Sequence, residues 1–225
     1  MPAAVPAADP PTGMVVLGVD PGLTRCGLGV LTGPSARPRL LAVECVRTSS
    51  SQPTEQRLLR VHDALLEVIH RYQPVAVAVE RVLFSGNART AMATGQAAGA
   101  ALLAAARAGL PVTAYSPNEV KLTVTGSGAA DKDAVARLVA AQLCLTAPPA
   151  PADVADALAV ALTHLARARM AAAVAGTPAA TALAAAEQQA SRAAKGGWQA
   201  VLGDRLGPAG DPKRPEDAVV RGRTR

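Results

Sequence analysis

Four carboxylates in this sequence stand at positions that suit phosphoryl-transfer chemistry. Asp20 ends the apolar stretch VVLGVD, and Glu80 ends a second one, PVAVAVE. Asp153 and Asp156 stand three residues apart, at the start of an apolar stretch of helical period. Carboxylates without a His or Cys metal-binding pattern are typical ligands of Mg²⁺ or Mn²⁺. Two such ions can activate a water and stabilise the leaving oxygen of a phosphodiester.

The elements that carry these acids must place them at one edge of a sheet. The apolar stretches before Asp20 and Glu80 are typical of strands covered on both faces. In open α/β sheets, ligands collect at the carboxyl ends of such strands, so two parallel neighbours would put these acids side by side. The spacing of Asp153 and Asp156 puts both on one face of a first helical turn. In the ordinary alternative, Asp153 caps the helix and Asp156 is a solvated first-turn acid.

The rest of the pattern predicts an α/β fold with a mixed five-stranded sheet flanked by helices on both faces. Three strands come first, and helices then alternate with strands. The expected strands cover residues 15–20, 27–32, 40–47, 74–80 and 111–115. The expected helices cover residues 56–71, 88–108, 132–143 and 154–170, and Asp131 is the expected N-cap of the third. Gly95 and Gly99 in the second helix indicate close packing or a dimer contact.

Composition divides the chain into one folded domain and two flanking segments. Residues 1–13 are a leader rich in Pro and Ala, residues 14–170 carry the periodic pattern, and residues 171–225 are a basic segment rich in Ala, Gly and Pro. We expect the leader and most of the last segment to be disordered. The leader lacks the apolar core of a signal peptide, and no apolar run is long enough to span a membrane. This predicts a cytoplasmic protein with no membrane partner.

The net charge suits a polyanionic partner and the cysteines match no zinc site, but neither feature identifies the function. The net charge of +6 comes from 23 Lys and Arg against 17 Asp and Glu, which suits a polyanionic partner. Cys26, Cys45 and Cys144 are widely spaced and match no zinc-binding pattern. We therefore expect them to be reduced, small core residues.

Four stretches together resemble the RuvC family of Holliday-junction resolvases, within the ribonuclease H-like superfamily. They are LGVDPGLTRCGLGV, VAVERVLFSGNARTAMATGQAAG, NEVKLTVTGSGAADKDAV and PADVADALAVALTH, which span about residues 15–166 in order. The resemblance implies a ribonuclease H-like fold and a Mg²⁺-dependent endodeoxyribonuclease. Such an enzyme binds four-way junction DNA as a homodimer and nicks two strands symmetrically. It would use two Mg²⁺ ions per active site, replaceable by Mn²⁺, and would have the branch-migration complex of its repair pathway as a partner.

The resemblance also assigns roles to single residues. It matches the four acids to the catalytic and metal-binding quartet of the family: Asp20, Glu80, Asp153 and Asp156. It matches Lys121 and Lys132 to basic residues that contact DNA near the scissile phosphate, where a cation positions the backbone and stabilises charge. These are the only lysines among residues 14–170, beside thirteen arginines. The ordinary alternative is that both are exposed surface lysines.

The loop after Glu80 departs from the family pattern. The family has a Phe three residues after its Glu, and this side chain inserts at the junction centre; here Leu83 holds that position and Phe84 follows. We predict that Phe84 stacks at the junction, because it is the only Phe of the chain and stacking contributes about 1–3 kcal/mol. In the alternative, Leu83 inserts and Phe84 belongs to the core. We expect Asn87 and Arg89 to contact backbone phosphates, and the altered loop leaves the sequence preference at the cut open.

Other function classes stay open on sequence alone. Actin-like sugar kinases and ATPases share an Asp-x-Gly hairpin, but residues 14–170 are too few for their two domains. Another ribonuclease H-like nuclease, or a non-catalytic junction-binding protein, is also compatible with the pattern. We expect His62, His70 and His164 to pack or to face solvent, since they are scattered over the predicted helices.

Overall fold

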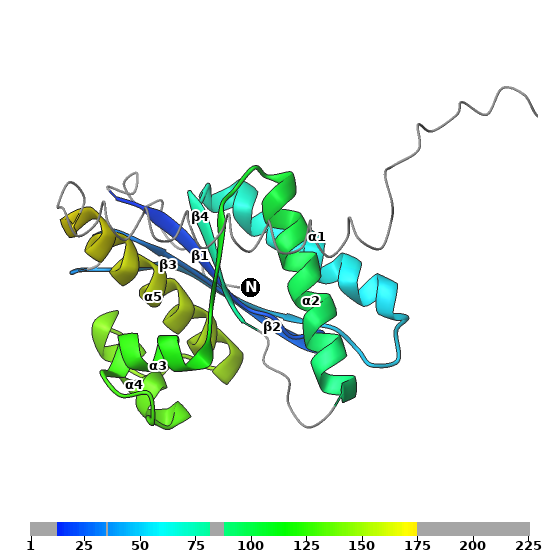
Figure 1. The fold of residues 1–225 in the computed structure, drawn as a ribbon. Helices are drawn as coiled ribbons and strands as arrows, with labels where there is room; N and C mark the ends of the chain where they lie inside the picture. Colours follow the sequence, from blue (N-terminus) through cyan, green and yellow to red (C-terminus); the bar gives the residue numbers. More distant parts are fainter. Residues whose placement is uncertain (1–12, 35, 82–87, 175–225) are drawn as a thin grey trace, which may run out of the picture. The chain divides into compact units, whose positions relative to one another are not determined.

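The chain folds around one mixed five-stranded sheet with helices on both faces (Figure 1), and the computed structural model describes residues 13–34, 36–81 and 88–174. The strands are β1 (Val15–Asp20), β2 (Arg25–Thr32), β3 (Arg39–Arg47), β4 (Ala76–Glu80) and β5 (Val112–Tyr115). The helices are α1 (Thr54–Tyr72), α2 (Ala88–Arg107), α3 (Pro117–Thr125), α4 (Lys132–Gln142) and α5 (Ala152–Val174). The predicted α/β class and the mixed sheet are thus confirmed.

The sheet has the strand order β3-β2-β1-β4-β5, with β1 at its centre. β1 pairs with β2 in antiparallel orientation and with β4 in parallel orientation. The register joins Val19 to Val79, so the next residue of each strand, Asp20 and Glu80, leaves the sheet at the same end. The two strands are therefore the parallel neighbours that the sequence pattern requires for a shared acidic edge.

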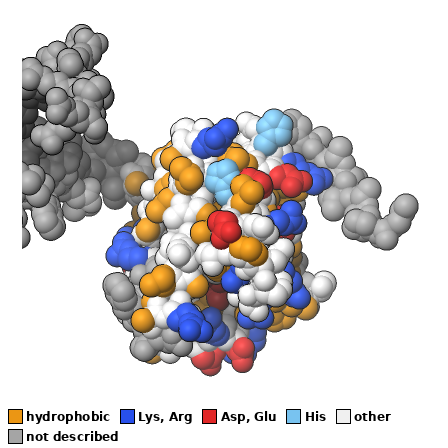
Figure 2. Space-filling view, turned by 90° about the vertical axis from the view of Figure 1, so that its right-hand side faces the viewer, with side chains coloured by type: hydrophobic (Ala, Val, Ile, Leu, Met, Phe, Trp, Pro, Cys, Tyr) orange, Lys and Arg blue, Asp and Glu red, His pale blue; other side chains and the backbone are white. Residues whose placement is uncertain are grey.

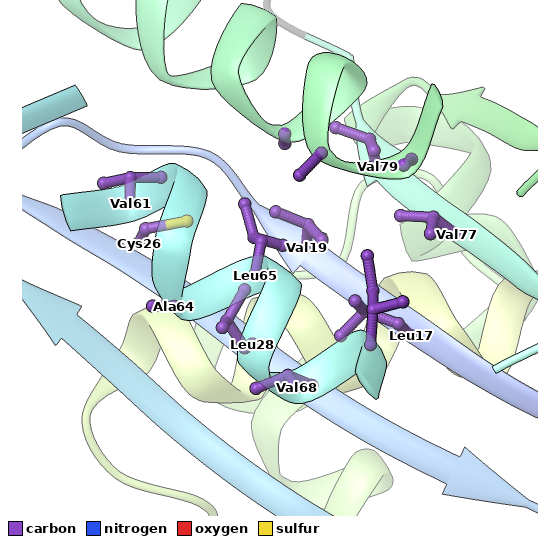
Figure 3. Packing of buried hydrophobic residues seen from close by; sticks show 14 of the residues in the cluster. Leu17, Val19, Cys26, Leu28, Val61, Ala64, Leu65, Val68, Val77 and Val79 are labelled. Carbon is purple, nitrogen blue, oxygen red and sulfur yellow. The ribbon is translucent and has the colours of Figure 1, made fainter. Parts of the chain in front are cut away.

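Helices α1 and α2 cover one face of the sheet through interlocking aliphatic side chains (Figure 3). Leu17 and Val19 of β1 point into this layer, where they meet Leu65 and Val61 of α1. All four are at most 1% exposed. At 20–33 cal/mol per Å² of apolar surface, burial of side chains of this size contributes about 1.5–3 kcal/mol each. This layer stabilises the fold because its side chains fill the space between the sheet and the two helices.

Helix α5 covers the opposite face, together with α3 and α4, and packs much closer to the sheet. Three glycines line its path: Gly18 in β1, and Gly27 and Gly29 in β2. A Cβ added at Gly18 would overlap the carbonyl oxygen of Ala157, and one added at Gly27 would overlap that of Asp153. The absence of side chains at these glycines lets the α5 backbone approach the strands closely there, while sheet side chains such as Val16 and Leu31 pack around the contact.

The helix α3 was not predicted from the sequence. The stretch that begins Ser116-Pro117-Asn118 is typical of a turn, but it starts a helix through a capping box: Ser116 Oγ accepts from the backbone N of Glu119, and the Glu119 carboxylate accepts from the backbone N of Ser116. The predicted N-cap Asp131 is confirmed, because its Oδ1 accepts from the backbone N of Ala134 at 2.6 Å.

The expectation for the cysteines was wrong for one of three. Cys26 is buried and Cys45 is partly buried, but Cys144 is exposed in the turn after α4, where its φ is +54°. No helix in the described ranges is both long and apolar enough to cross a membrane. The predicted leader 1–13 and basic segment 171–225 lie almost wholly outside the described residues, so those domain limits stay a prediction.

Candidate active site

Asp20 and Asp153 meet at Gly27, near the start of β2. Asp20 pairs with Gly27 across the β1–β2 ladder. The missing side chain of Gly27 admits the backbone oxygen of Asp153, in the first turn of α5. The strand glycine therefore determines how close the helix acids come to the strand acid.

The acids of the two strands lie close enough for a side-chain hydrogen bond between Asp20 and Glu80. Burial, followed by the charge of Glu80 and then that of Asp156, raises the pKa of Asp20 to about 8. Burial and the charge of Asp156 also raise the pKa of Glu80, while a hydrogen bond from Asp20 and the charges of Lys132 and Lys121 lower it in part. Near neutral pH, Asp20 is therefore the protonated partner that donates to Glu80.

The acids of α5 have counter-charges from this chain. Lys132 Nζ, in the first turn of α4, donates to Asp156 Oδ2 at 3.1 Å. This hydrogen bond raises the pKa of Lys132, and the charges of Asp20 and Glu80 add to the effect. Lys132 is an exposed lysine, with 76% of its side chain accessible, and it is paired with one of the four acids.

Asp153 meets a second cation. Arg25 Nε, at the start of β2, lies 3.0 Å from Asp153 Oδ2. The two groups form an ion pair at a distance typical of a hydrogen bond, but Asp153 Oδ2 makes no hydrogen bond of acceptable geometry. We read the contact as an ion pair, because charge attraction tolerates poor alignment. Asp153 and Asp156 are 19% and 22% exposed at their side chains, so both face a partly solvated edge.

The donor chemistry of this edge fits a hard divalent cation. All four groups are carboxylates, and oxygen ligands are what Mg²⁺ and Mn²⁺ prefer. In the described residues, however, no three His, Cys, Asp or Glu side chains converge closely enough to hold an ion. Arg25 and Lys132 pair with the acids of α5, and the raised pKa of Asp20 favours a proton on the strand pair. A metal would have to replace these partners.

The remaining predicted site residues divide into three groups. Lys121 is half-buried in α3, and its charge acts on Glu80, so it lies near the acids. Arg89 is in the first turn of α2 and lines a groove together with Asp153. Leu83, Phe84 and Asn87 lie outside the described residues.

Sequence reasoning missed Arg25 and the two glycines of β2 as contributors to the site, and it anticipated the packing role of His164. Arg25 gave no motif signal, although its position at the start of β2 puts it beside the acids. The glycines Gly27 and Gly29 alternate in β2 and so share one face, which could have signalled a close helix contact. His164 packs as expected: its Nδ1 lies 3.0 Å from the hydroxyl of Tyr115.

Comparison with known proteins gives concordant matches across this region. The family described as "Crossover junction endodeoxyribonuclease RuvC" matches residues 16–164. The chain is 50% identical over 187 residues to the protein of that name from Pseudarthrobacter chlorophenolicus. This alignment covers 79% of this chain and 97% of the relative. It is 54% identical over 153 residues to that of Parafrankia sp., with 68% and 86% covered.

Solved structures give the same result. The structure of T. thermophilus RuvC in complex with Holliday junction substrate matches with a TM-score of 0.68 and 47% identity, covering 70% of this chain and 96% of the other. A second Thermus thermophilus RuvC structure matches with a TM-score of 0.66 and 48% identity, with the same coverage. The matched part contains all four acids and both lysines described above.

Proposed function

Because the chain belongs to the crossover junction endodeoxyribonuclease RuvC family, we propose that it resolves four-way DNA junctions by paired symmetric nicks. The observation that carries the proposal is the acidic edge itself: carboxylates from β1, β4 and α5 gather at one end of the sheet beside Lys132. This combination suits phosphodiester hydrolysis, because carboxylates can hold divalent ions and the lysine adds a further cation, and cations stabilise the negative charge that develops on the phosphate.

The chain's own residues would perform defined parts of the reaction. Asp20 and Glu80 are held by the sheet, so their positions are set before substrate binds. Lys132 sits within reach of a phosphate at the acids and can exchange its bond to Asp156 for one to a phosphate oxygen. Lys121, whose charge reaches Glu80, would contribute a second cation.

Membership of this family implies a divalent metal ion, and we propose two Mg²⁺ per active site, replaceable by Mn²⁺. Asp20, Glu80, Asp153 and Asp156 would hold the ions. When bound, the ions activate a water and stabilise the leaving oxygen. Asp20 must then lose its proton, and Asp153 and Asp156 must leave Arg25 and Lys132.

Substrate contacts outside the acids extend the proposal. We propose that Arg89 and Asn87 contact backbone phosphates, and that Phe84 inserts at the junction centre, with Leu83 as the alternative. Sequence preference at the cut does not follow from these residues.

A second copy of the chain would supply the second nick. The proposed contact is the outer surface of α1 and α2, where Leu59, Met92 and Leu103 are 58%, 66% and 62% exposed. Figure 2 looks onto this side of the molecule and shows hydrophobic side chains between charged ones. Leu59 and Leu103 also line an apolar groove of about 420 Å³ between the two helices. Apolar surface of this kind is typical of a protein interface.

A branch-migration complex as partner and a cytoplasmic location stay predictions.

The test is a nicking assay on a synthetic immobile four-way junction, with linear duplex and single strands as controls. We expect paired symmetric nicks on the junction alone, present with Mg²⁺ or Mn²⁺ and absent with EDTA. Asp20→Asn keeps the side-chain size and removes the charge, so it should reduce nicking at least about 100-fold while junction binding persists. Binding without nicks across several core sequences would favour the non-catalytic alternative, and cleavage of RNA instead would favour another nuclease.

A further inference from the structure

A groove lined by arginines opens beside the acidic edge. Its volume is about 420 Å³, and it lies between the β1–β2 turn and the first turns of α1 and α2. Its polar lining includes Arg25, Arg57, Arg89 and Asp153, together with three threonines, Thr24, Thr90 and Thr94. Three arginines face one acid there, so the lining is net positive.

Two of the arginines are placed by contacts that fix their direction. Arg57 is half-buried: its Nε donates to Thr48 Oγ1 at 2.8 Å, and its Nη2 donates to Thr24 Oγ1 at 3.0 Å. Thr48 in turn is buried and donates to the carbonyl of Leu23, which ties the guanidinium to the β1–β2 turn. Arg25 also lines the groove, and its Nε lies 3.0 Å from Asp153 Oδ2.

Asp153 belongs to both the groove and the acidic edge. A ligand in the groove therefore lies next to whatever occupies the acids. Its chemistry follows from the lining, since guanidinium groups with neighbouring hydroxyls match the oxygens of a phosphate. With a DNA strand on the acids, the adjoining stretch of its backbone would bring phosphate to this position.

We propose that this groove is a phosphate-binding subsite that holds the substrate strand beside the scissile phosphate. Arg57 is the fixed cation of the subsite, and Arg25 exchanges its contact with Asp153 for one with the phosphate. Release of Asp153 by Arg25 frees a carboxylate for the acidic edge, so strand binding and completion of the site occur together. This inference rests on the proposed function and adds to it the path of the strand.

The experiment measures binding to a fluorescently labelled four-way junction by anisotropy in EDTA, where no cutting occurs. Arg25→Gln and Arg57→Gln are compared with Arg107→Gln, which removes the same charge at the far end of α2, about 27 Å from Arg89 at 1.5 Å per residue. We expect the two groove variants to weaken binding about 3- to 10-fold more than the control. The slope of log Kd against log salt concentration should fall by about one for each.

The outcomes separate the subsite from the proposed function. If the unchanged protein does not bind or nick the junction, the proposed function fails. If it does both, and the groove variants bind like Arg107→Gln, the subsite is overturned. Should Arg57→Gln prove unfolded by circular dichroism, Arg25→Gln and Arg89→Gln decide the question. The last measurement is calorimetry with inorganic phosphate on the unchanged protein and the groove variants. If the variants lose phosphate binding but bind the junction like the unchanged protein, the groove binds a small anion and the proposal is overturned.

Discussion

The two faces of the sheet are packed by opposite means. Beneath α1 and α2, side chains such as Leu17 and Leu65 fill the space between helix and sheet. Beneath α5, the helix backbone lies against the strands at Gly18 and Gly27, and side chains such as Leu158 pack around these contacts. Side chains in a packed layer can shift when a neighbour changes, whereas a backbone pressed on a backbone has no such freedom.

The two faces of the sheet also contribute differently to the site. The face beneath α1 and α2 carries none of the four acids, while α5 supplies two of them. The first acid of α5, Asp153, contributes its own carbonyl to the contact with Gly27. The close face therefore sets the distance between helix acids and strand acids, and the filled face supplies stability. Each prediction below tests one side of this contrast.

The largest effect is expected for Gly27→Ala. Its Cβ would overlap the carbonyl oxygen of Asp153, so the first turn of α5 must move away from the sheet. A displacement near 1 Å at reacting groups costs about 100-fold in rate, and overpacking costs about 1–3 kcal/mol in stability. Junction nicking with Mg²⁺ should fall about 100-fold, measured on protein shown to be folded. Nicking at the normal rate would show that α5 is not positioned by this contact.

The opposite result is expected for Leu65→Ala on the filled face. Leu65 is 1% exposed, and truncation of a buried Leu lowers the free energy of unfolding by about 2–5 kcal/mol. The nicking rate per folded molecule should stay within about threefold of normal. Urea unfolding gives the stability and single-turnover nicking gives the rate. A rate loss as large as that of Gly27→Ala would remove the proposed division between the faces.

The same contrast explains how much could be predicted from the sequence. The strands of the core were predicted within two residues, because buried strands such as 15–20 are continuous apolar runs bounded by Gly and Pro. The parallel pairing of β1 and β4 was a condition of the predicted acidic edge, and the observed register meets it. The direct path of α5 did not follow, because glycines in strands carry no mark of which helix lies on them.

The site shows a similar limit. The four acids could be singled out because a charge at the end of an apolar run is unusual and has few explanations. Arg25 could not, since one arginine among thirteen looks like any solvated charge until the fold brings it 3.0 Å from Asp153. Helix α3 was missed because its capping residues are the same types that form turns. Motif reasoning finds residues with rare patterns, whereas packing contacts between distant segments need the structure.

The proton on the acidic edge predicts a smaller, pH-dependent effect. The folded-state pKa of Asp20 is raised from 3.8 to about 8, so between these pH values the folded protein holds a proton that the unfolded chain releases. Stability without metal is therefore highest below about pH 4 with respect to this group and falls as the pH rises towards 8. Asp20→Asn removes the effect, so in EDTA its Tm should exceed that of the unchanged protein by several degrees at pH 8.5. The difference should shrink towards pH 5.

The control for this titration is metal binding. A divalent ion must displace the proton of Asp20, so its apparent affinity should rise with pH up to about 8 and then level off. Calorimetry with Mn²⁺ at pH 6.5, 7.5 and 8.5 measures this directly. An affinity that is independent of pH, together with equal Tm values for the two proteins, would mean that Asp20 is ionised throughout this range.

The smallest effect is expected for alanine substitutions at the α2 glycines Gly95 and Gly99, where an added Cβ would meet open space. A Cβ added at Gly95 or Gly99 of α2 meets no atom within 4 Å, in contrast to Gly27. Alanine in a helix interior is favoured over glycine by about 0.5–1 kcal/mol, so each variant should raise the free energy of unfolding of the monomer by about that amount. Chemical unfolding at protein concentrations too low for dimers measures it.

The same two variants test whether α2 forms the dimer contact. Gly99 lines the apolar groove between α1 and α2, so a second copy packed there would meet the new methyl group. In that case Gly99→Ala stabilises the monomer yet weakens the dimer, which sedimentation equilibrium detects as a higher dimer Kd. An unchanged dimer Kd for both variants would place the partner copy elsewhere, because methyl groups added at positions open in the single chain would then stay open in the dimer.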